Sequence, residues 1–387
     1  MTENVEDLIK LIQKSEEKWG ILTGNGFNLS CCVKTDYQSL CHGLVHSFGS
    51  ELTQEEISLL CQEFASKGFN FEVWISEKSK NDYMHKIALR AIHRQWLVEF
   101  VKACALDQKQ YIFSDRINEF LNLFHFFFTL NVDPFFYRRC LARKEIPYPP
   151  SEPQSELEPI QTQNNKTTAK SSAISQNVFL GKTADTIQEV NASCLTKKAK
   201  KELGLIPEEL EKPKEVVDGF NTHGNLSNRE VIQKDHSLFY LHGACHLKIV
   251  TAPDGKKTMI KLKASDERSL ISSIRAEDPD TNSAVFAGTS QEKLKKIQEN
   301  QYLKDQLDAF GKIESTNLVI YGASLAENDA HIWNTINNND YIKDLYISFH
   351  GNSHSQIQET AQKTFSNKKV TLFETEQFVA EDQGAEQ

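Results

Sequence analysis

Four short apolar runs, each followed at once by glycine or polar residues, constrain the fold of this chain most strongly. A run of this kind is typical of a buried strand that ends in a tight turn. Predicted helices lie between the runs, and this alternation favours a mostly parallel sheet with helices on both faces. The four predicted strand ends are Thr23-Gly24-Asn25-Gly26, Thr129-Leu130-Asn131-Val132-Asp133, Leu241-His242-Gly243 and Gly322-Ala323-Ser324-Leu325.

Apolar periodicity places the remaining elements around these ends. Residues 3–16 carry apolar side chains at helical spacing. We predict strands at 19–23, 124–131, 237–241, 317–321 and 345–349, with 259–262 and 284–286 as candidate strands. We predict helices at 291–310, with a break near Asn300, and at 329–338 and 355–365. Together these elements describe a Rossmann-like α/β fold.

The predicted α/β domain spans residues 1–375 and carries two insertions. Residues 36–122 are mostly helical in pattern, with a last helix from Asp115 to Leu123. Residues 145–214 hold few large apolar side chains, so they cannot bury enough surface to offset the entropy of ordering. We therefore predict a mobile polar insertion there. Residues 376–387 have the composition of a flexible tail.

Composition limits the partners and the compartment. The formal net charge of −9 argues against direct nucleic-acid binding, which needs clustered Lys and Arg. The N-terminal stretch lacks an apolar signal core, and no run of about 18 apolar residues predicts a membrane span. The eight cysteines form no CxxC pair. We therefore predict a cytoplasmic protein with free thiols, no membrane contact and no metal site.

The turn at Gly24 and Gly26 has the character of a phosphate-binding turn. Glycines let the backbone approach a pyrophosphate, and the start of the following helix favours negative charge. The third glycine of a GxGxxG pattern is missing, because Leu29 occupies that place. The alternative is a tight turn that only closes a strand–helix unit.

The other strand ends supply polar side chains, each with a structural alternative. Asn131 and Asp133 point to the same side if the chain stays extended, or they cap the strand and the next helix. His242 suits general-base work or ribose contacts, or it is a packed structural histidine. Ser324 offers a hydroxyl to a phosphate or a ribose. His246 lies near His242, but no convincing set of metal ligands surrounds the pair.

The carboxyl ends of parallel strands line one crevice, where ligands bind in open α/β sheets. The four strand ends therefore converge, in prediction, on one nucleotide site.

The ordered set of strand ends resembles the sirtuin-like NAD-binding superfamily, in a bacterial branch without a zinc ribbon that is catalogued as a domain of unknown function. Such proteins carry a glycine turn, a T-x-N-x-D segment, an H-G segment and a G-x-S segment in this order. The branch also shows three longer segments, which stand here as Tyr240–Leu247, Gly288–Leu294 and Gly322–Asp329. The resemblance covers most of residues 18–375 outside the polar insertion.

The resemblance implies NAD as the substrate. Asn131 and His242 become the catalytic pair, with Asp133 orienting nicotinamide or steadying charge. The implied cofactor-binding residues are Gly24, Asn25, Gly26, Asn28, Gly322 and Ser324. The absent zinc ribbon, and G-N-G-F-N in place of G-A-G-x-S, depart from the pattern of protein deacylases.

Three functions follow as hypotheses. The first is an NAD glycohydrolase, similar to NAD-hydrolysing effectors of anti-phage defence, with an activating protein or self-association as an implied partner. The second is a non-catalytic module that senses NAD or ADP-ribose. The third is an NAD-dependent protein deacylase.

Overall fold

The computed structural model describes residues 4–31, 33–47, 54–68, 71–78, 83–106, 115–142, 218–220, 237–251, 255, 257–262, 267–276, 281–376 and 378. The chain divides into two compact units, and these residues all belong to the one formed by Met1–Ile146 and Glu215–Gln387. The predicted polar insertion at 145–214 lies outside the described residues, as does nearly all of the predicted tail at 376–387.

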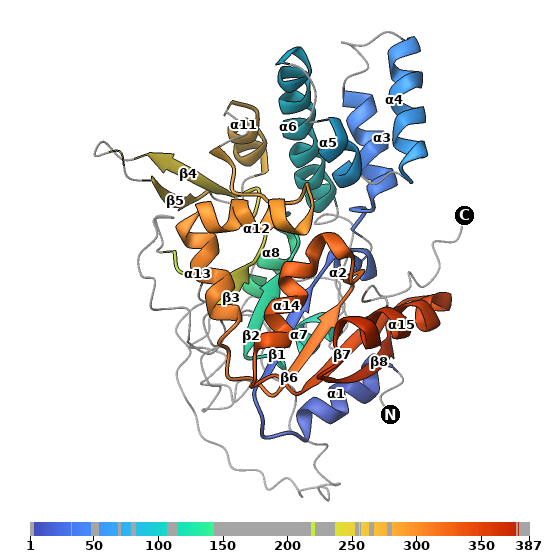
Figure 1. Ribbon diagram of the computed structural model, residues 1–387, viewed down its shortest axis with the longest axis vertical. Helices are drawn as coiled ribbons and strands as arrows, with labels where there is room; N and C mark the ends of the chain where they lie inside the picture. The colour runs from blue at the N-terminus through green and yellow to red at the C-terminus, as the bar shows by residue number, and fades with distance from the viewer. Residues whose placement is uncertain are drawn as a thin grey trace, which may run out of the picture. The chain divides into compact units, whose positions relative to one another are not determined.

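A six-stranded sheet with the order β3-β2-β1-β6-β7-β8 forms the centre of this unit (Figure 1). Each neighbouring pair of its strands is parallel. From β1 the chain adds strands first on one side and then, from β6 on, on the other, so the strand order reverses between β1 and β6. The strands are β1 (Trp19–Thr23), β2 (Phe126–Thr129), β3 (Ser237–Tyr240), β6 (Asn317–Tyr321), β7 (Asp344–Phe349) and β8 (Lys369–Glu374).

Burial explains why the central strands consist of apolar runs. Every residue of β1, β2, β3 and β6 is buried, because helices cover both faces of a parallel sheet. In the register, Ile21 of β1 pairs with Phe127 on one side and Val319 on the other. At one edge, β8 buries only Phe373 fully, so its sequence has a weaker apolar pattern.

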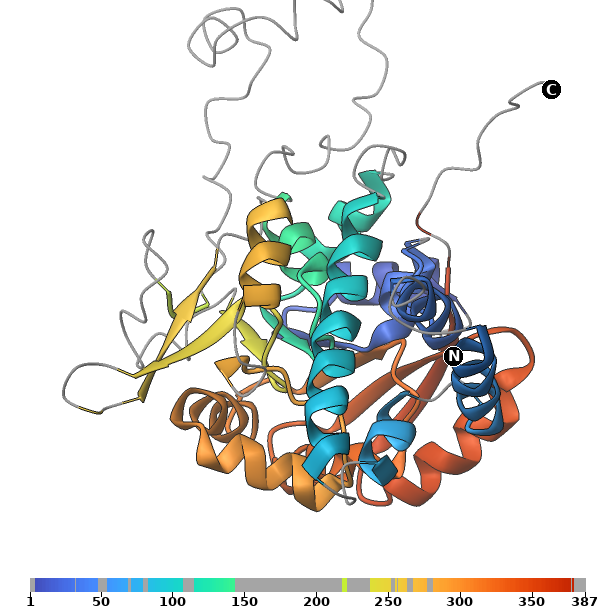
Figure 2. The ribbon, with the colours of Figure 1, turned by 90° about the horizontal axis from the view of Figure 1, so that it is seen from above.

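Helices cover both faces of the sheet, as Figures 1 and 2 show from two directions. One face carries α13, α14 and α15, and the opposite face carries α1, α7 and α8. An ion pair of 2.8 Å between Arg116 of α7 and Glu6 of α1 joins two helices of the second group. The bounds are α1 (Val5–Gln13), α7 (Asp115–Asn122), α8 (Phe135–Ala142), α12 (Ser290–Glu299), α13 (Gln301–Phe310), α14 (Ala330–Asn338) and α15 (His354–Thr364).

A second hydrophobic cluster lies among the helices that connect β1 to β2, together with α11. Phe71 and Trp96 stack in it at 3.9 Å between ring centroids and 10° between planes. Val132 and Cys245, from the loops after β2 and β3, belong to the same cluster. These loops therefore pack against the helical segment. The helices are α2 (Asn25–Ser30), α3 (Tyr37–Ser47), α4 (Gln54–Ser66), α5 (Phe71–Lys78), α6 (Tyr83–Leu106) and α11 (Glu267–Ala276).

The structure confirms the predicted α/β fold and most of the predicted strands. The break near Asn300 is real, because Asn300 ends α12 and its side chain caps α13. The candidate strand at 284–286 is wrong: this stretch forms no strand, although Val285 N donates to the carbonyl oxygen of His242 at 2.8 Å. The candidate at 259–262 is part of β5 (Lys257–Lys261), which pairs antiparallel with β4 (Leu247–Thr251).

Short 3₁₀ turns precede two of the described helices, η5 (Glu327–Asp329) before α14 and η6 (Gly351–Ser353) before α15. Among the described helices, none combines the length and the apolar character needed to cross a membrane.

Candidate functional site

The turns after β1 and β6 contact each other through their backbones. Gly26 donates its N–H to the carbonyl oxygen of Gly322 at 2.8 Å, and Gly24 donates to that of Tyr321 at 2.8 Å. A Cβ on Gly322 would lie 2.2 Å from the nitrogen of Phe27, and a Cβ on Gly26 would lie 2.6 Å from the Cα of Gly322. Glycine is therefore required here by the approach of two chain segments, whatever else the turn binds.

The loop after β2 joins this glycine turn through asparagine side chains. Asn131 donates from Nδ2 to the carbonyl oxygen of Gly24 at 3.2 Å and to Oδ1 of Asn28 at 3.0 Å. Asn28 in turn donates from Nδ2 to Oδ2 of Asp133 at 2.8 Å. Both amide hydrogens of Asn131 are used in these bonds. Its Oδ1 is therefore the atom left to accept a hydrogen bond from a ligand or a water.

Asp133 has the helix-capping role that its position before Pro134 suggested. Its Oδ1 accepts the backbone N–H of Phe135, the first residue of α8, at 2.8 Å. Cys104 lies 3.5 Å from the same oxygen, and Asn28 occupies the other one. Burial raises the pKa of Asp133, which the bonds from Phe135, Asn28 and Cys104 partly counteract. Both oxygens of Asp133 thus serve the local structure.

The loop after β3 brings His242 against a second histidine. The Nε2 atoms of His242 and His331 lie 3.0 Å apart, and their rings stack at 5.1 Å and 27°. The other ring nitrogen of His331 lies 3.1 Å from Oγ of Ser290. Both rings are nearly enclosed, His242 with 3% and His331 with 5% of its surface exposed. Asn131 and His242 share no hydrogen bond in the described part of the chain.

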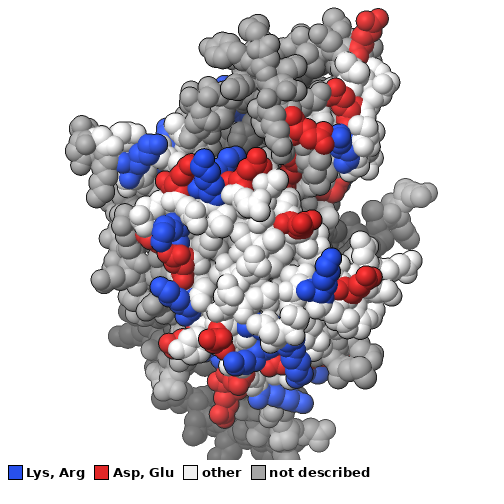
Figure 3. Space-filling view, in the orientation of Figure 1, with Lys and Arg blue, Asp and Glu red and all other residues white. Residues whose placement is uncertain are grey.

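A buried ion-pair cluster lies beside His242. On the face of the molecule shown in Figure 3, acidic and basic side chains are interspersed at the surface. Lys293 of α12 differs from these, since only 1% of its side chain is exposed. Its Nζ lies 2.8 Å from Oε2 of Glu72 and 2.9 Å from Oδ1 of Asp329. Tyr37 and Asn328 also donate to Glu72. The cluster therefore joins α3 and α5 to α12 and η5.

The protonation states in this cluster follow from burial and from the ion pairs. Burial raises the pKa of Glu72, an effect that Lys293 opposes. Burial alone would lower the pKa of Lys293, but Glu72 and Asp329 outweigh it and the pKa is raised. Lys293 is therefore an ammonium ion at neutral pH.

His242 is neutral at the edge of the same cluster. Burial lowers its pKa well below the usual range, and Lys293 and His331 lower it further. The pKa of His331 falls to about 4, mainly through burial. Asp329 lies 3.7 Å from Nε2 of His242, but Lys293 already neutralises that carboxylate. The His242–Asp329 contact is consequently a neutral ring beside a paired carboxylate, not an ion pair.

The three longer segments of the sequence resemblance meet in this one place. Tyr240–Leu247 supplies His242, Gly288–Leu294 supplies Ser290 and Lys293, and Gly322–Asp329 supplies Asn328 and Asp329. The sequence did not single out Glu72, Lys293 or His331 as site residues. The available signal was the charge of Lys293 one helical turn before the buried Ile297, on the apolar side of α12.

Two predicted cofactor-binding side chains keep a polar atom that no described residue engages. Ser324 is exposed just after the Gly322 turn. Asn25 donates from Nδ2 to the carbonyl oxygen of Thr35 at 2.7 Å, while its buried Oδ1 has no hydrogen-bond partner among the described residues. That oxygen can accept from a ligand hydroxyl.

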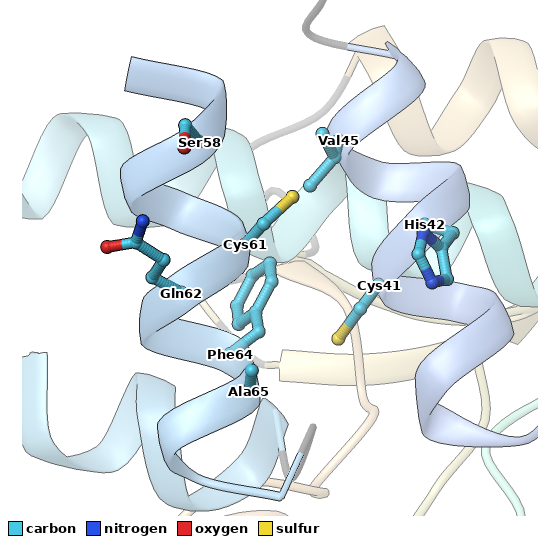
Figure 4. A pocket seen from close by; sticks show the side chains of 8 residues that line it. All are labelled: Cys41, His42, Val45, Ser58, Cys61, Gln62, Phe64 and Ala65. Carbon is cyan, nitrogen blue, oxygen red and sulfur yellow. The ribbon is translucent and has the colours of Figure 1, made fainter. Parts of the chain in front are cut away.

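Two hollows elsewhere in the described structure do not involve the predicted residues. One, of about 690 Å³, lies between α15 and the edge strand β8. The other, of about 320 Å³, lies between α3 and α4, where Cys41 and Cys61 face the space between the helices (Figure 4). Burial raises the pKa of Cys41 to about 12, so its thiol stays protonated and unreactive.

In the comparisons with known proteins, one family model without an assigned activity matches part of the chain. The family model described as Domain of unknown function (DUF4917) matches residues 205–385. The match spans β3 to β8, and so includes His242 and Lys293 but not Gly24 or Asn131. No curated protein matches the chain. Within the described residues, no three His, Cys, Asp or Glu side chains form a group that could hold a metal ion.

Proposed function

We propose that this chain binds NAD at the carboxyl edge of its sheet and hydrolyses the bond between nicotinamide and ribose. The observation that carries the proposal is the strand order, with its reversal between β1 and β6. In open α/β sheets of this order, dinucleotides bind at the carboxyl ends of the strands, at the reversal. The glycine turns after β1 and β6 lie at that point.

The predicted catalytic side chains follow the strands next to the reversal. Asn131 follows β2 and His242 follows β3, and β1, β2 and β3 are adjacent. Neighbouring strands lie about 4.8 Å apart, so the ends of these three strands fall within about 10 Å. That distance is within the span of one bound dinucleotide.

The surroundings of the turns suit a dinucleotide. The N–H groups of Gly24, Gly26 and Gly322 donate to Tyr321, Gly322 and Ser348, so at these turns a pyrophosphate would be attracted by the start of α2 and not held by those N–H groups. The buried Oδ1 of Asn25, which has no hydrogen-bond partner in the described part of the chain, could accept a ribose hydroxyl, and the exposed Ser324 can donate to a phosphate or a ribose. Asn28 holds Asn131 in place, so its contribution to binding would be indirect.

Hydrolysis would proceed by attack of water on the anomeric carbon of the ribose. The carbon–nitrogen bond breaks, its electron pair stays on the nicotinamide nitrogen, and positive charge develops on the ribose as in glycoside hydrolysis. Oδ1 of Asn131 would hold the water, since the amide group is fixed by Gly24 and Asn28. The neutral His242 would take the proton, directly or through a ribose hydroxyl. The products are nicotinamide and ADP-ribose.

The test is incubation of the purified full chain with NAD, followed by chromatography for nicotinamide and ADP-ribose. We expect both products in equal amounts, and a loss of at least about 100-fold in rate for Asn131→Ala and for His242→Gln. His246→Gln is the matched control, because His246 is also buried in the loop after β3 but packs on Tyr137. Activity that is lost equally in both histidine variants would contradict a chemical role for His242.

A binding module without turnover is the second candidate. The observation that favours it is the enclosure of His242, which is 3% exposed and hydrogen-bonded to His331. Calorimetry with NAD and with ADP-ribose separates the candidates, since binding without product formation supports the module. Neither binding nor products would remove both candidates.

The resemblance to defence effectors and to deacylases defines two further measurements. Cellular NAD during phage infection, with and without the His242→Gln variant, tests a defence role that depends on an activating protein or on self-association. An acyl-lysine peptide panel with NAD tests the deacylase alternative. NAD-dependent deacylation without free ADP-ribose would replace the proposed hydrolase activity.

A further inference from the structure

His242 and His331 are neutral rings in contact, so the hydrogen position on one ring determines that on the other. A separation of 3.0 Å between ring nitrogens is a hydrogen bond, so one Nε2 carries a hydrogen and the other accepts it. The two possible arrangements differ in chemistry. If His242 accepts at Nε2, its hydrogen is on Nδ1 and the ring has no lone pair left for a substrate. If His242 donates from Nε2, its Nδ1 is a free proton acceptor.

The polar groups next to the two rings favour the arrangement in which His242 donates its Nε2 hydrogen to His331. Oδ1 of Asp329 lies 3.7 Å from Nε2 of His242, so a hydrogen on this nitrogen lies beside a carboxylate oxygen, although Lys293 pairs with the same atom. At the far end, Oγ of Ser290 accepts the backbone N–H of His331 at 2.8 Å and lies 3.1 Å from Nδ1 of the same residue. Ser290 thus already acts as an acceptor toward His331, and when its own hydroxyl hydrogen points away from the ring, its second lone pair accepts a hydrogen from Nδ1.

We propose that His331 is a positioning residue that accepts the Nε2 hydrogen of His242 and so holds Nδ1 of His242 as the proton acceptor of the site. Ser290 holds His331 by accepting its Nδ1 hydrogen, which leaves Nε2 of His331 unprotonated. The order of bonds is His242 Nε2–H to His331 Nε2, and His331 Nδ1–H to Ser290 Oγ. A base held by a second group, which is itself held by a third, is the general arrangement for activating water or a hydroxyl.

The charged side chains around His242 and His331 keep both rings neutral. Lys293 on α12 and Asp329 on η5 face His242, and Glu72 on α5 faces Lys293. When His242 takes a proton on Nδ1, Lys293 opposes the new cation, and Asp329, which pairs with Lys293 and lies 3.7 Å from Nε2 of His242, offsets part of that repulsion. The inference rests on the proposed function for its chemical meaning, but the hydrogen positions are a property of the free protein.

The first test is nitrogen NMR of the full chain labelled with ¹⁵N-histidine, near neutral pH and without ligand. We expect His242 to carry its hydrogen on Nε2 and His331 on Nδ1, and substitution of each residue assigns its signals. His331→Leu should release the tautomer of His242 into a mixture. A His242 that carries its hydrogen on Nδ1 overturns the proposal, even if the chain hydrolyses NAD.

The second test compares rates of NAD hydrolysis. We expect His331→Leu to lower kcat by about 10–100-fold with KM within about twofold, and His331→Gln, whose side-chain oxygen can accept the Nε2 hydrogen, to recover at least about half of the loss on a logarithmic scale. Trp333→Phe is the control, because Trp333 lies on the same helix as His331. The change removes the hydrogen bond from Trp333 to the carbonyl oxygen of Ala326 and leaves the contact between His242 and His331 intact. Equal losses in Trp333→Phe and His331→Leu would contradict positioning. No hydrolysis by the wild-type chain, with the expected tautomers present, would remove the proposed function alone.

Discussion

Gly26 donates its backbone N–H to the carbonyl oxygen of Gly322, and this 2.8 Å bond ties the turn after β1 to the turn after β6. The two residues are far apart in the sequence but adjacent at the point where the strand order reverses. A sheet that continues on both sides of β1 needs β1 and β6 to lie side by side. The bond between their following turns therefore belongs to the fold as much as to any ligand.

Gly322→Ala should strongly destabilise the protein. Gly322 has a φ of +69°, and an added Cβ would lie 2.2 Å from the nitrogen of Phe27. We expect the free energy of unfolding to fall by about 3–4 kcal/mol, from backbone strain plus displacement of the turn. Denaturant unfolding measures this loss.

Gly351→Ala is the matched control for this substitution. Gly351 has a φ of +52°, but a Cβ there has nothing within 4 Å. It should lose only the strain of the left-handed backbone, about 1 kcal/mol. Equal losses in the two variants would show that contact between the glycine turns is unimportant for stability.

Asp133→Ala should lower stability by about 2–4 kcal/mol. The substitution removes the cap on α8 and leaves the Nδ2 of Asn28 without its buried acceptor. Thr289→Ala is the control, since Thr289 caps α12 in an exposed capping box, and about 1 kcal/mol is expected there. A loss in Asp133→Ala no larger than in Thr289→Ala would mean that the buried network around Asn28 contributes little.

The sequence was sufficient to predict the central strands because each is an apolar run with a sharp polar end. β1 and β6 were predicted with their observed bounds. The edge strand β8 was not predicted, since its partly exposed residues from Lys369 to Glu374 do not form an apolar run. Strand order could not be predicted from periodicity, because it depends on contacts between segments that are distant in the chain.

The candidate site was only partly predictable for the same reason. Asn131 and His242 were predicted as site residues because they follow apolar runs, a local feature. Lys293 and Glu72 are 221 positions apart, and the place of Lys293 one turn before Ile297 suggests its burial but does not identify its partner. Such ion pairs depend on how the helical segment packs on α12. The sequence alone contains no short-range pattern for that packing.

Lys293→Met should destabilise the protein by about 3–5 kcal/mol. It leaves Glu72 and Asp329, whose side chains are 14% and 17% exposed, as partly buried carboxylates without a cation. Adding Glu72→Gln to the variant should restore about 1–3 kcal/mol, because one of the two charges is removed. Lys295→Met is the control on the same helix: Lys295 is 78% exposed in its pair with Glu299, and a change within about 0.5 kcal/mol is expected. If Lys293→Met matched Lys295→Met, the buried cluster would make no net contribution.

The buried histidines predict a loss of stability in acid. His331 binds its proton only below a pKa of about 4 in the folded state, whereas an unfolded histidine binds it below about 6.5. Between these pH values the unfolded chain holds more protons, so stability should fall as the pH falls from 6.5 to 4, by up to about 3 kcal/mol from His331 alone. The pKa of His242 is also lowered, and its contribution has the same sign.

Denaturant unfolding of wild type and of His331→Gln across this pH range isolates the contribution of His331. Glu72 and Asp133 have raised pKa values that act in the opposite direction, but both residues are present in both proteins. We expect a shallower decline in the variant, and parallel curves would mean that His331 is not held neutral by the fold.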